Sequence, residues 1–256
     1  MKIFSLVNHK GGVGKSTLSF NMAFYLSQSY KVLVIDMDPQ GNLSLISKSD
    51  PSSKGTYEAM FRGDKIENCI QQITPSYYLM SGGYELSAAD EMFSESERFS
   101  KRVLKLREVL EKIRGIDFVV IDTPPHLRIL TANALSVSNK VIIPALADVF
   151  SSNGLIMLSK FIQKIKDEIN PSLSIDGILI NRYKRNSIFQ KEMVEVLEKI
   201  AKKLGTKVYE SKIRESVKVS EGSAQFIPIY QYEGGAKYGV SEDMRSFLEE
   251  FIKGVE

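Results

Sequence analysis

The sequence contains very little cysteine and histidine. Of its 256 residues, one is a cysteine, Cys69, and two are histidines, His9 and His126. A single thiol excludes an intrachain disulfide and a Cys-x-x-Cys metal pair, and two histidines exclude a histidine-rich metal site. Such cysteine usage is typical of proteins from a reducing compartment. We therefore expect a cytoplasmic protein.

The sequence also lacks a long hydrophobic run. Its apolar runs are far shorter than the roughly 20 residues that a membrane-spanning helix needs. The apolar run at residues 1–7 is too short for the core of a secretory signal, and it leads directly into a glycine-rich segment. We therefore expect a soluble chain with neither a signal peptide nor a stable membrane anchor.

What the sequence does contain is an alternation of short Ile- and Val-rich runs with amphipathic stretches. This pattern predicts an α/β fold, in which a mostly parallel central sheet is flanked by helices. No linker divides the chain, so we expect one domain over residues 1–256. The expected strands cover residues 2–7, 31–35, 116–121, 140–143 and 174–180. The expected helices run from the glycine-rich loop to about residue 27 and over residues 97–114, 152–169, 188–204 and 241–252, and the segment 49–83 is expected to hold loops with short helices.

The segment HKGGVGKST at residues 9–17 lies between the first expected strand and the first expected helix. That context is typical of a phosphate-binding loop, because glycines let backbone N–H groups surround phosphate oxygens and the helix N-terminus favours negative charge. Lys15 would reach the β- and γ-phosphates, Ser16 would bind Mg²⁺ and Thr17 would support the α-phosphate side. The loop residues expected to hold the nucleotide are Lys10, Gly11, Gly12, Val13, Gly14, Lys15, Ser16 and Thr17.

The start of this loop departs from the ordinary P-loop pattern. The ordinary pattern places glycine where this chain has His9, and a second lysine, Lys10, follows. The segment from Lys10 to Thr17 resembles the deviant Walker A motif of the ParA/MinD family of P-loop ATPases. The resemblance implies ATP and Mg²⁺ as cofactors and an ATP-dependent homodimer. It also implies that Lys10 crosses the dimer interface and contacts the partner's nucleotide, like an arginine finger.

Two further hydrophobic runs end in aspartates. The run VLVIDMDPQGN at residues 32–42 contains Asp36 and Asp38, and the run FVVIDTPP at residues 118–125 contains Asp122. Both resemble motifs of the same family, the second one being a Walker B pattern. The resemblance implies that Asp38 orients or deprotonates the attacking water, that Asp36 lies near the metal, and that Asp122 binds Mg²⁺ or holds Ser16 in place.

Weaker resemblances extend towards the C-terminus. Asp148 lies where the family tends to carry an acid. Asn181 follows the expected strand at residues 174–180, where the family recognises adenine, and the backbone near Pro228 lies where the family flanks the base. We therefore expect Asn181 and Pro228 to contact the nucleotide.

The net charge of +3 is unevenly distributed. Residues 182–218 contain eleven basic and five acidic residues, a net charge of +6, which leaves −3 for the rest of the chain. Such a region binds phosphates without sequence preference, or it is a solvated face. Glu215 lies where similar proteins often carry a basic residue, whereas Arg185 and Lys218 match DNA-contacting positions. The expected DNA contacts are Arg182, Lys184, Arg185, Arg214 and Lys218.

These features favour a ParA-like partitioning ATPase located on the nucleoid. Its ATP-bound dimer would bind DNA non-specifically, and a ParB-like partner would stimulate hydrolysis and release it. A positioning ATPase for a protein cargo fits the same motifs. A MinD-like membrane ATPase is less favoured, because the expected helix at residues 241–252 has an acidic polar face that anionic lipids would repel. A metal-cluster reductase of the superfamily would need more cysteines than Cys69.

Overall fold

The computed structural model of the protein describes residues 1–90, 99–232 and 239–255. These residues form an eight-stranded sheet with the order β3-β4-β2-β5-β1-β6-β7-β8. All neighbouring strands of this described sheet pair in parallel except β3, which is antiparallel to β4. The strands are β1 (Lys2–Leu6), β2 (Val32–Asp36), β3 (Gln71–Thr74), β4 (Tyr77–Met80), β5 (Phe118–Asp122), β6 (Lys140–Ala145), β7 (Ser174–Tyr183) and β8 (Val208–Arg214).

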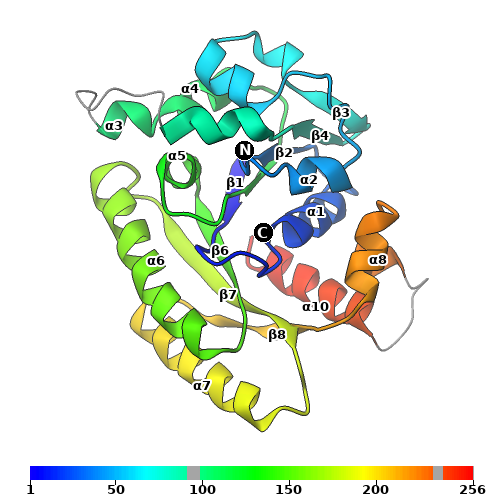
Figure 1. Cartoon of the computed structure of the whole chain (residues 1–256), viewed down its shortest axis with the longest axis vertical. Coiled ribbons are helices and arrows are strands. Elements are labelled where there is room, and N and C mark those ends of the chain that lie inside the picture. Colours follow the sequence, from blue (N-terminus) through cyan, green and yellow to red (C-terminus); the bar gives the residue numbers. More distant parts are fainter. Residues whose placement is uncertain (91–98, 233–238, 256) are drawn as a thin grey trace.

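Helices cover both faces of the sheet (Figure 1). One face packs against α4 (Lys105–Leu110), α5 (Ile129–Val137), α6 (Val149–Glu168) and α7 (Ile188–Lys203). The other packs against α1 (Lys15–Leu26), α2 (Asn42–Ile46), α9 (Ile229–Tyr232) and α10 (Val240–Lys253), and α8 (Lys218–Ala224) adjoins α9. Shorter elements are α3 (Phe99–Arg102), a π-helical turn (Glu58–Arg62) and two 3₁₀ segments (Ile66–Asn68 and Tyr84–Asp90).

Strands β1, β2, β5 and β6 are buried on both faces, which explains their continuous apolar sequences. In β1, Ile3 belongs to the hydrophobic cluster beneath α4–α7, whereas Phe4 and Leu6 belong to the cluster beneath α1 and α10. The same alternation places Ile121 in the first cluster and Val120 in the second. The α/β architecture predicted from the alternation of strands and helices is therefore confirmed.

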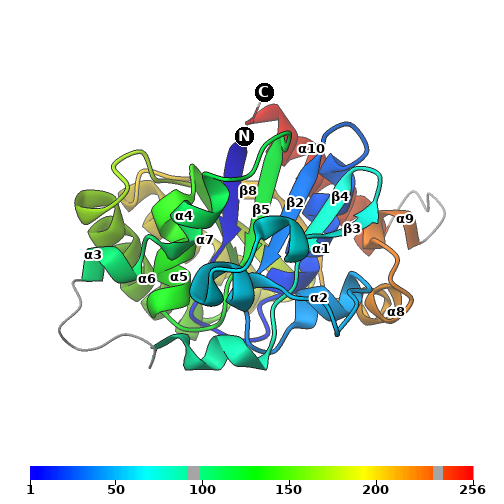
Figure 2. The ribbon, with the colours of Figure 1, turned by 90° about the horizontal axis from the view of Figure 1, so that it is seen from above.

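Helix α10 is part of this core. Its residues Met244, Phe247 and Phe251 are at most 1% exposed and pack beneath the sheet. The two termini lie side by side (Figure 2), and Lys2 donates a hydrogen bond to the carbonyl oxygen of Val255. The apolar stripe that the sequence shows in this helix is thus used for packing. None of the helices within the described residues has both the length and the apolar character that crossing a bilayer requires.

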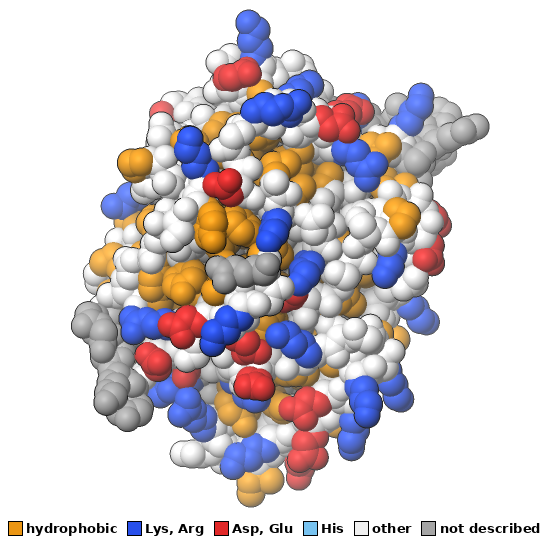
Figure 3. All heavy atoms as spheres, turned by 180° about the vertical axis from the view of Figure 1, so that it is seen from behind, with side chains coloured by type: hydrophobic (Ala, Val, Ile, Leu, Met, Phe, Trp, Pro, Cys, Tyr) orange, Lys and Arg blue, Asp and Glu red, His pale blue; other side chains and the backbone are white. Residues whose placement is uncertain are grey.

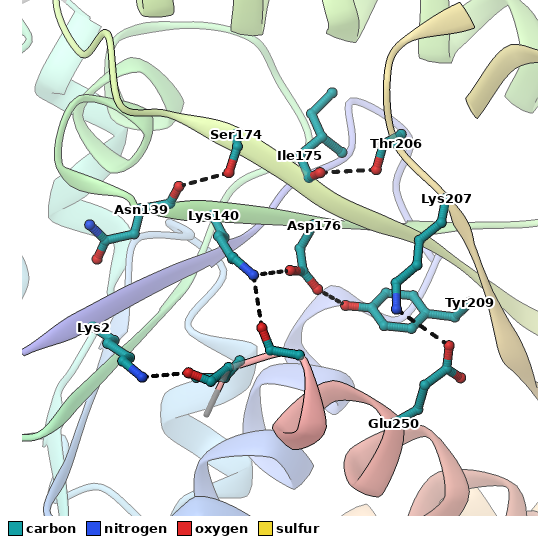
Figure 4. Close-up of polar contacts among 12 residues, drawn as sticks. Lys2, Asn139, Lys140, Ser174, Ile175, Asp176, Thr206, Lys207, Tyr209 and Glu250 are labelled. Atoms are coloured by element: carbon teal, nitrogen blue, oxygen red, sulfur yellow. Dashed lines mark hydrogen bonds and ion pairs between the residues drawn. The ribbon is translucent and has the colours of Figure 1, made fainter. Parts of the chain in front are cut away.

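A polar network at the amino ends of the strands fastens the end of α10 (Figure 4). Lys140 Nζ donates to Asp176 Oδ1 at 2.7 Å and to the carbonyl oxygen of Gly254 at 3.1 Å. Asp176 also accepts a hydrogen bond from the Tyr209 hydroxyl, and Lys207 pairs with Glu250 of α10. The C-terminal helix is therefore held at several points along its length.

The sequence missed several elements. Strands β3 and β4 lie in the segment 49–83, where only loops and short helices were expected, and β8, α2 and α5 were not predicted. The helix expected over residues 97–114 is divided into α3 and α4, and residues 97–98 lie outside the described part. The physical reason is Asn133 of α5, whose amide donates to the Arg102 carbonyl at 2.9 Å and accepts from the Leu106 N–H at 3.1 Å. These bonds replace the helical hydrogen bonds at the break.

Candidate functional site

The loop between β1 and α1 has the geometry of an anion cradle. Gly12 and Gly14 have φ values of 72° and 94°, which L-residues with side chains adopt at a cost, and α1 begins directly after Gly14. Val13 between them is fully buried and anchors the loop. The N–H groups of the first turn of α1 thus lie at the carboxyl edge of the sheet, where they can donate hydrogen bonds to a phosphate.

Two cavities of about 480 and 420 Å³ flank this loop. The first is lined by Lys15, Ser16 and Asp38, and the two share Gly12, Gly14 and Thr17. The loop, the catalytic aspartate expected from sequence and the expected metal-binding hydroxyl therefore meet in one place. Together the cavities lie in the 300–1,000 Å³ range of small-molecule sites.

Lys15 is 7% exposed and its ammonium folds back over the loop. Its Nζ donates to the carbonyl oxygen of Asn8 at 3.2 Å and to that of Lys10 at 3.5 Å. Burial lowers the pKa of Lys15, although the Asp122 and Asp38 carboxylates oppose that shift. A buried ammonium that makes two long hydrogen bonds to carbonyls within the described residues is well suited to accept an anionic ligand.

Asp122, at the end of β5, is fully buried, and it faces Asp36 across the β2–β5 pair. Burial, reinforced by the nearby Asp36 carboxylate, raises the pKa of Asp122. Its Oδ1 lies 3.4 Å from the Ser19 hydroxyl, and its Oδ2 has no hydrogen-bond partner within the described residues. A buried carboxylate oxygen without a partner costs free energy that a cation would recover.

This arrangement fits Mg²⁺, a hard cation that prefers oxygen ligands and takes few of them from protein. The Ser16 hydroxyl lies close enough to the Asp122 carboxyl to oppose the rise in its pKa, so the expected hydroxyl and carboxylate are neighbours. The described residues contain no cluster of three or more His, Cys, Asp or Glu that could hold a metal alone. The ligand set therefore suits an ion that arrives with phosphates.

Asp36 lies at the end of β2 and is also fully buried, but its carboxylate is already engaged. Oδ1 accepts from the Asp38 N–H at 3.0 Å, and Oδ2 accepts from the Ser44 N–H at 2.9 Å and the Ser44 hydroxyl at 2.7 Å. Burial raises the pKa of Asp36 to about 6. Among the described residues, Asp36 is not part of the lining of either cavity. This geometry favours a role in holding the following loop and α2 over the metal contact expected from sequence.

Asp38 is oriented differently. It is 7% exposed, its Oδ1 accepts from the Gln40 N–H at 3.0 Å, and its side chain lines the first cavity. A carboxylate in this position, across the cavity from the loop, can accept a hydrogen bond from a water molecule beside a bound phosphate.

Lys10 points away from both cavities. Its Nζ forms an ion pair with Asp148 Oδ2 at 2.6 Å and lies 5.9 Å from the centre of the Phe150 ring. The other oxygen of Asp148 caps α6 by accepting from the Ser151 N–H at 2.8 Å. Lys10 is not among the described residues that line the two cavities. In this structure the Lys10 ammonium is therefore held outside both cavities.

The two residues expected at the base are placed differently. Asn181 lines the second cavity, where its amide donates to the Val13 carbonyl at 2.8 Å. The amide oxygen accepts from the Arg182 N–H at 2.9 Å. Pro228 is buried and, among the described residues, does not belong to the lining of either cavity. Of the two residues, Asn181 thus lies at the site, and Pro228 is buried away from the cavity linings.

The basic residues expected to contact DNA gather at the carboxyl ends of β7 and β8, but acids lie among them. Glu215 pairs with Arg182 at 2.9 Å and with Lys184 at 3.0 Å. Asp243, at 6% side-chain exposure, pairs with Arg185 at 3.0 Å and with Arg214 at 2.6 Å. Figure 3 shows the same mixing of basic and acidic side chains over the face opposite to that of Figure 1. Lys218 begins α8 in the same part of the chain.

Some site residues were not predicted from the sequence. Gln40 and Asn42 line the first cavity, and the Asp-Pro-Gln-Gly-Asn segment that contains them was the signal available. Asn8 was also missed, although its Oδ1 accepts from the Lys10 N–H at 2.9 Å. A single asparagine before a glycine-rich loop carries no recognisable pattern.

Comparison with known proteins places the chain in a family. The family model described as an AAA domain matches residues 1–175. The chromosome-partitioning ATPase Soj of Treponema pallidum is 33% identical over 237 residues, which cover 91% of this chain and 90% of that protein. The chain belongs to the ParA/Soj family of P-loop ATPases. The chromosome partitioning protein ParA of Caulobacter vibrioides is 30% identical, with 91% and 88% covered.

Solved structures of similar proteins agree with this ParA/Soj membership. One of them is a Borrelia burgdorferi B31 protein bound to AMPPNP, which is described as a plasmid partition protein. It is 26% identical to this chain, with a TM-score of 0.81 and 98% of each chain covered. Apo McdA of Cyanothece has the same fold, with a TM-score of 0.87, 22% identity and the full length of both chains covered. The resemblance and the P-loop fold expected from sequence are thus confirmed.

Proposed function

We propose that this protein is an ATP-dependent partitioning ATPase that segregates plasmid or chromosomal DNA in the cytoplasm, with residues 1–256 acting as one domain. ATP with Mg²⁺ would drive two copies together and so create a surface that binds DNA without sequence preference. Hydrolysis, stimulated by a ParB-like partner, would return the protein to monomers and release the DNA. The names of the Soj and ParA relatives support the partitioning assignment.

Nucleotide binding follows from the geometry of the loop. The N–H groups beside Gly12 and Gly14 would hold phosphate oxygens, and Lys15 would exchange its two carbonyl contacts for the β- and γ-phosphates. Mg²⁺ would be held by Ser16 and Asp122, and when bound it would neutralise charge on the phosphates. The bound nucleotide and its metal ion would thereby compensate the buried ionisable groups of Lys15 and Asp122.

Hydrolysis requires a positioned water molecule. Asp38 faces the same cavity as Lys15 and Ser16, so it would accept a hydrogen bond from that water and draw it towards the γ-phosphate. The Asp38 carboxylate accepts a hydrogen bond from the exposed side of the loop, at the Gln40 N–H, and we expect the geometry to be completed when a partner binds. Slow intrinsic turnover would follow.

The single observation that carries the dimer proposal is the position of Lys10. Every glycine of the loop turns towards the nucleotide cavities, yet the Lys10 ammonium is paired with Asp148 outside them. A side chain on this outward side reaches a second copy of the chain more readily than its own nucleotide. In a face-to-face dimer, Lys10 would leave Asp148 and contact the partner's phosphates in the manner of an arginine finger.

The DNA proposal rests on the basic residues around β7 and β8. Arg182, Lys184 and Arg185 are 54–63% exposed at the side chain, so phosphate oxygens have access to them. Glu215 and Asp243 reduce the net charge of one copy, and we expect DNA binding to become appreciable only when dimerisation adds the patches of two copies.

Positioning of a protein cargo along DNA remains the second candidate, because the same site and the same basic residues would serve it. The genes beside this one would distinguish the two candidates. A neighbouring gene for a centromere-binding partner supports partitioning, and a neighbouring gene for a cargo protein supports positioning. A MinD-like membrane role is supported less, because the apolar residues of α10 pack in the core.

The test of the dimer proposal is Lys10→Ala. We expect this variant to bind a fluorescent ATP analogue with nearly wild-type affinity but to remain monomeric with ATP and Mg²⁺ in analytical ultracentrifugation. Lys15→Ala serves as the control, since it should lose nucleotide binding itself. A Lys10→Ala protein that dimerises normally would remove the basis for the trans contact.

A further inference from the structure

Two residues that follow β1 are bound to the segment that runs from β6 into α6. Asn8 Nδ2 donates to the carbonyl oxygen of Pro144 at 2.7 Å. Lys10 Nζ pairs with Asp148 Oδ2 at 2.6 Å. The residue between Asn8 and Lys10 also meets this segment, so the approach to the phosphate loop is fastened along one side by α6 and the strand before it.

That middle residue is His9, and its ring lies against Gly154 in α6. A Cβ atom added to Gly154 would come within 1.8 Å of His9 Cε1, 2.6 Å of Nε2 and 2.9 Å of Nδ1. A Cβ carbon cannot form a hydrogen bond and does not approach non-bonded atoms so closely. The imidazole therefore fills the space that any side chain at position 154 would occupy.

The glycine has no other evident use. Gly154 is buried near the start of a 20-residue helix, where glycine is about 1 kcal/mol less favourable than alanine. Its backbone is helical, so the reason for glycine is the close approach of the ring. His9 Nδ1 is buried and has no hydrogen-bond partner in the described part of the chain. The contact is thus one of shape, held by packing of the ring on the helix.

We propose that His9 and Gly154 are a size-matched pair of positioning residues that set how Lys10 is presented to a second copy of this chain. The inference rests on the proposed role of Lys10 in trans. Displacing the ring moves the backbone of the adjacent residue, and small errors at a reacting centre have large effects on rate and binding. Helix α6 is accordingly the element that positions the Lys10 backbone, through the contact of Gly154 with His9, whereas Asp148 at its start holds the Lys10 ammonium until a second copy binds.

The association test compares Gly154→Ala, His9→Ala and the double variant. We expect Gly154→Ala to weaken ATP-dependent dimerisation about tenfold, which is within the range of interaction energies between residues in contact. Binding of a fluorescent ATP analogue by the monomer should stay near wild type. The double variant should recover to within about threefold, because the new methyl group enters the space left by the ring. Ser159→Ala, on the same helix, is the matched control and should behave as wild type.

A second readout does not depend on dimerisation. Histidine NMR should give only two imidazole signals, because His9 and exposed His126 are the only histidines in the sequence. Burial of the ring, with smaller contributions from Lys15 and Lys10, lowers the pKa of His9. In Gly154→Ala the ring leaves the helix, so the pKa of His9 should rise towards the ordinary value.

The outcomes distinguish the His9–Gly154 inference from the proposed trans role of Lys10 on which it rests. Normal dimerisation of Lys10→Ala would overturn the trans role and this inference together. Loss of dimerisation in Lys10→Ala with a wild-type result for Gly154→Ala, in association and in the His9 pKa, would overturn this inference alone. If Gly154→Ala does not fold, the double variant must fold and dimerise, and its failure to do so would contradict the size match.

Discussion

The two charged regions of this molecule differ in burial. At the ends of β2 and β5, Asp36 and Asp122 are completely buried and lie on adjacent strands. At the ends of β7 and β8, Arg182 and Lys184 are more than half exposed and pair with Glu215. A buried charge must be compensated by a specific ligand or hydrogen bond, whereas an exposed pair contributes little and is readily exchanged. We therefore expect substitution of the buried aspartates to have large effects, whereas the proposed DNA role of the basic region would depend on its net charge.

The largest effect should come from Asp38→Ala. The variant keeps the loop, Lys15 and Ser16, so it should bind ATP and dimerise, but it lacks the carboxylate that positions water. Hydrolysis should fall by about 10²–10⁴-fold, the usual contribution of a general base. Phosphate release and sedimentation measure the two properties on one sample. Turnover that survives within a factor of a few would show that Asp38 only lines the cavity.

A sharper test of burial is the pH dependence of Asp36→Asn. Burial raises the pKa of Asp36 to about 6, so the folded protein binds this proton more tightly than the unfolded chain does. Stability is therefore lost as the pH rises from about 4 to about 6, and Asn removes that loss. Relative to wild type, the variant should gain up to about 3 kcal/mol in its free energy of unfolding between pH 4 and pH 7.

Urea unfolding at several pH values measures this difference. Asp167→Asn, an exposed carboxylate on α6, is the control and should show no such trend. A difference between Asp36→Asn and wild type that stays flat over this range would mean that Asp36 is not a strongly perturbed acid.

Asp148→Asn examines the boundary between the two regions. Asparagine caps a helix as well as aspartate, so α6 should be retained while Lys10 loses its ion pair. Half-exposed pairs contribute about 1 kcal/mol or less, so ATP-dependent dimerisation should strengthen by no more than about fivefold. Asp148→Ala adds the loss of the cap and should also lower the melting temperature. Weaker dimerisation of Asp148→Asn would mean that the pair positions Lys10 productively.

The smallest effect should come from Glu215→Gln. Releasing Arg182 and Lys184 from their shared acid should raise DNA affinity a few-fold and steepen its salt dependence by about one to two units of slope. Anisotropy titrations at several salt concentrations measure both. Glu67→Gln, an exposed acid beyond the other edge of the sheet, should change neither. An unchanged slope for Glu215→Gln would indicate that these bases do not meet phosphate.

The sequence predicted those parts of the fold that carry strong local patterns. Strands β1, β2 and β5 are apolar throughout because both faces are buried, and the phosphate loop has its strand and helix on either side. Strand β8 was missed because its sequence, VYESKIR, is only partly buried and reads as polar. The break between α3 and α4 was missed because the residue that makes it, Asn133, comes from another helix.

The same limit applies to the site. The sequence predicted one site for Lys15, Asp38 and Asp122 because each belongs to a recognisable motif, and in the structure both aspartates lie near the Lys15 ammonium. It did not reveal that Asp148 lies 2.6 Å from Lys10, because these residues are far apart in the chain and meet only through the order β1-β6 in the sheet. Nor did it show that Ser44 engages the Asp36 carboxylate. Long-range pairing of polar side chains leaves no periodic signal.

The most direct measurement is binding of the purified protein to random-sequence duplex DNA, with ATP, with ADP and without nucleotide, at two salt concentrations. We predict binding that requires ATP and weakens with salt, and that each of Arg185→Ala and Lys218→Ala lowers the salt slope by about one unit. Asp38→Ala with ATP should give the tightest binding, because it cannot leave the dimeric state. Absence of DNA binding in all three nucleotide states would contradict the partitioning account and leave an ATPase that works on another matrix.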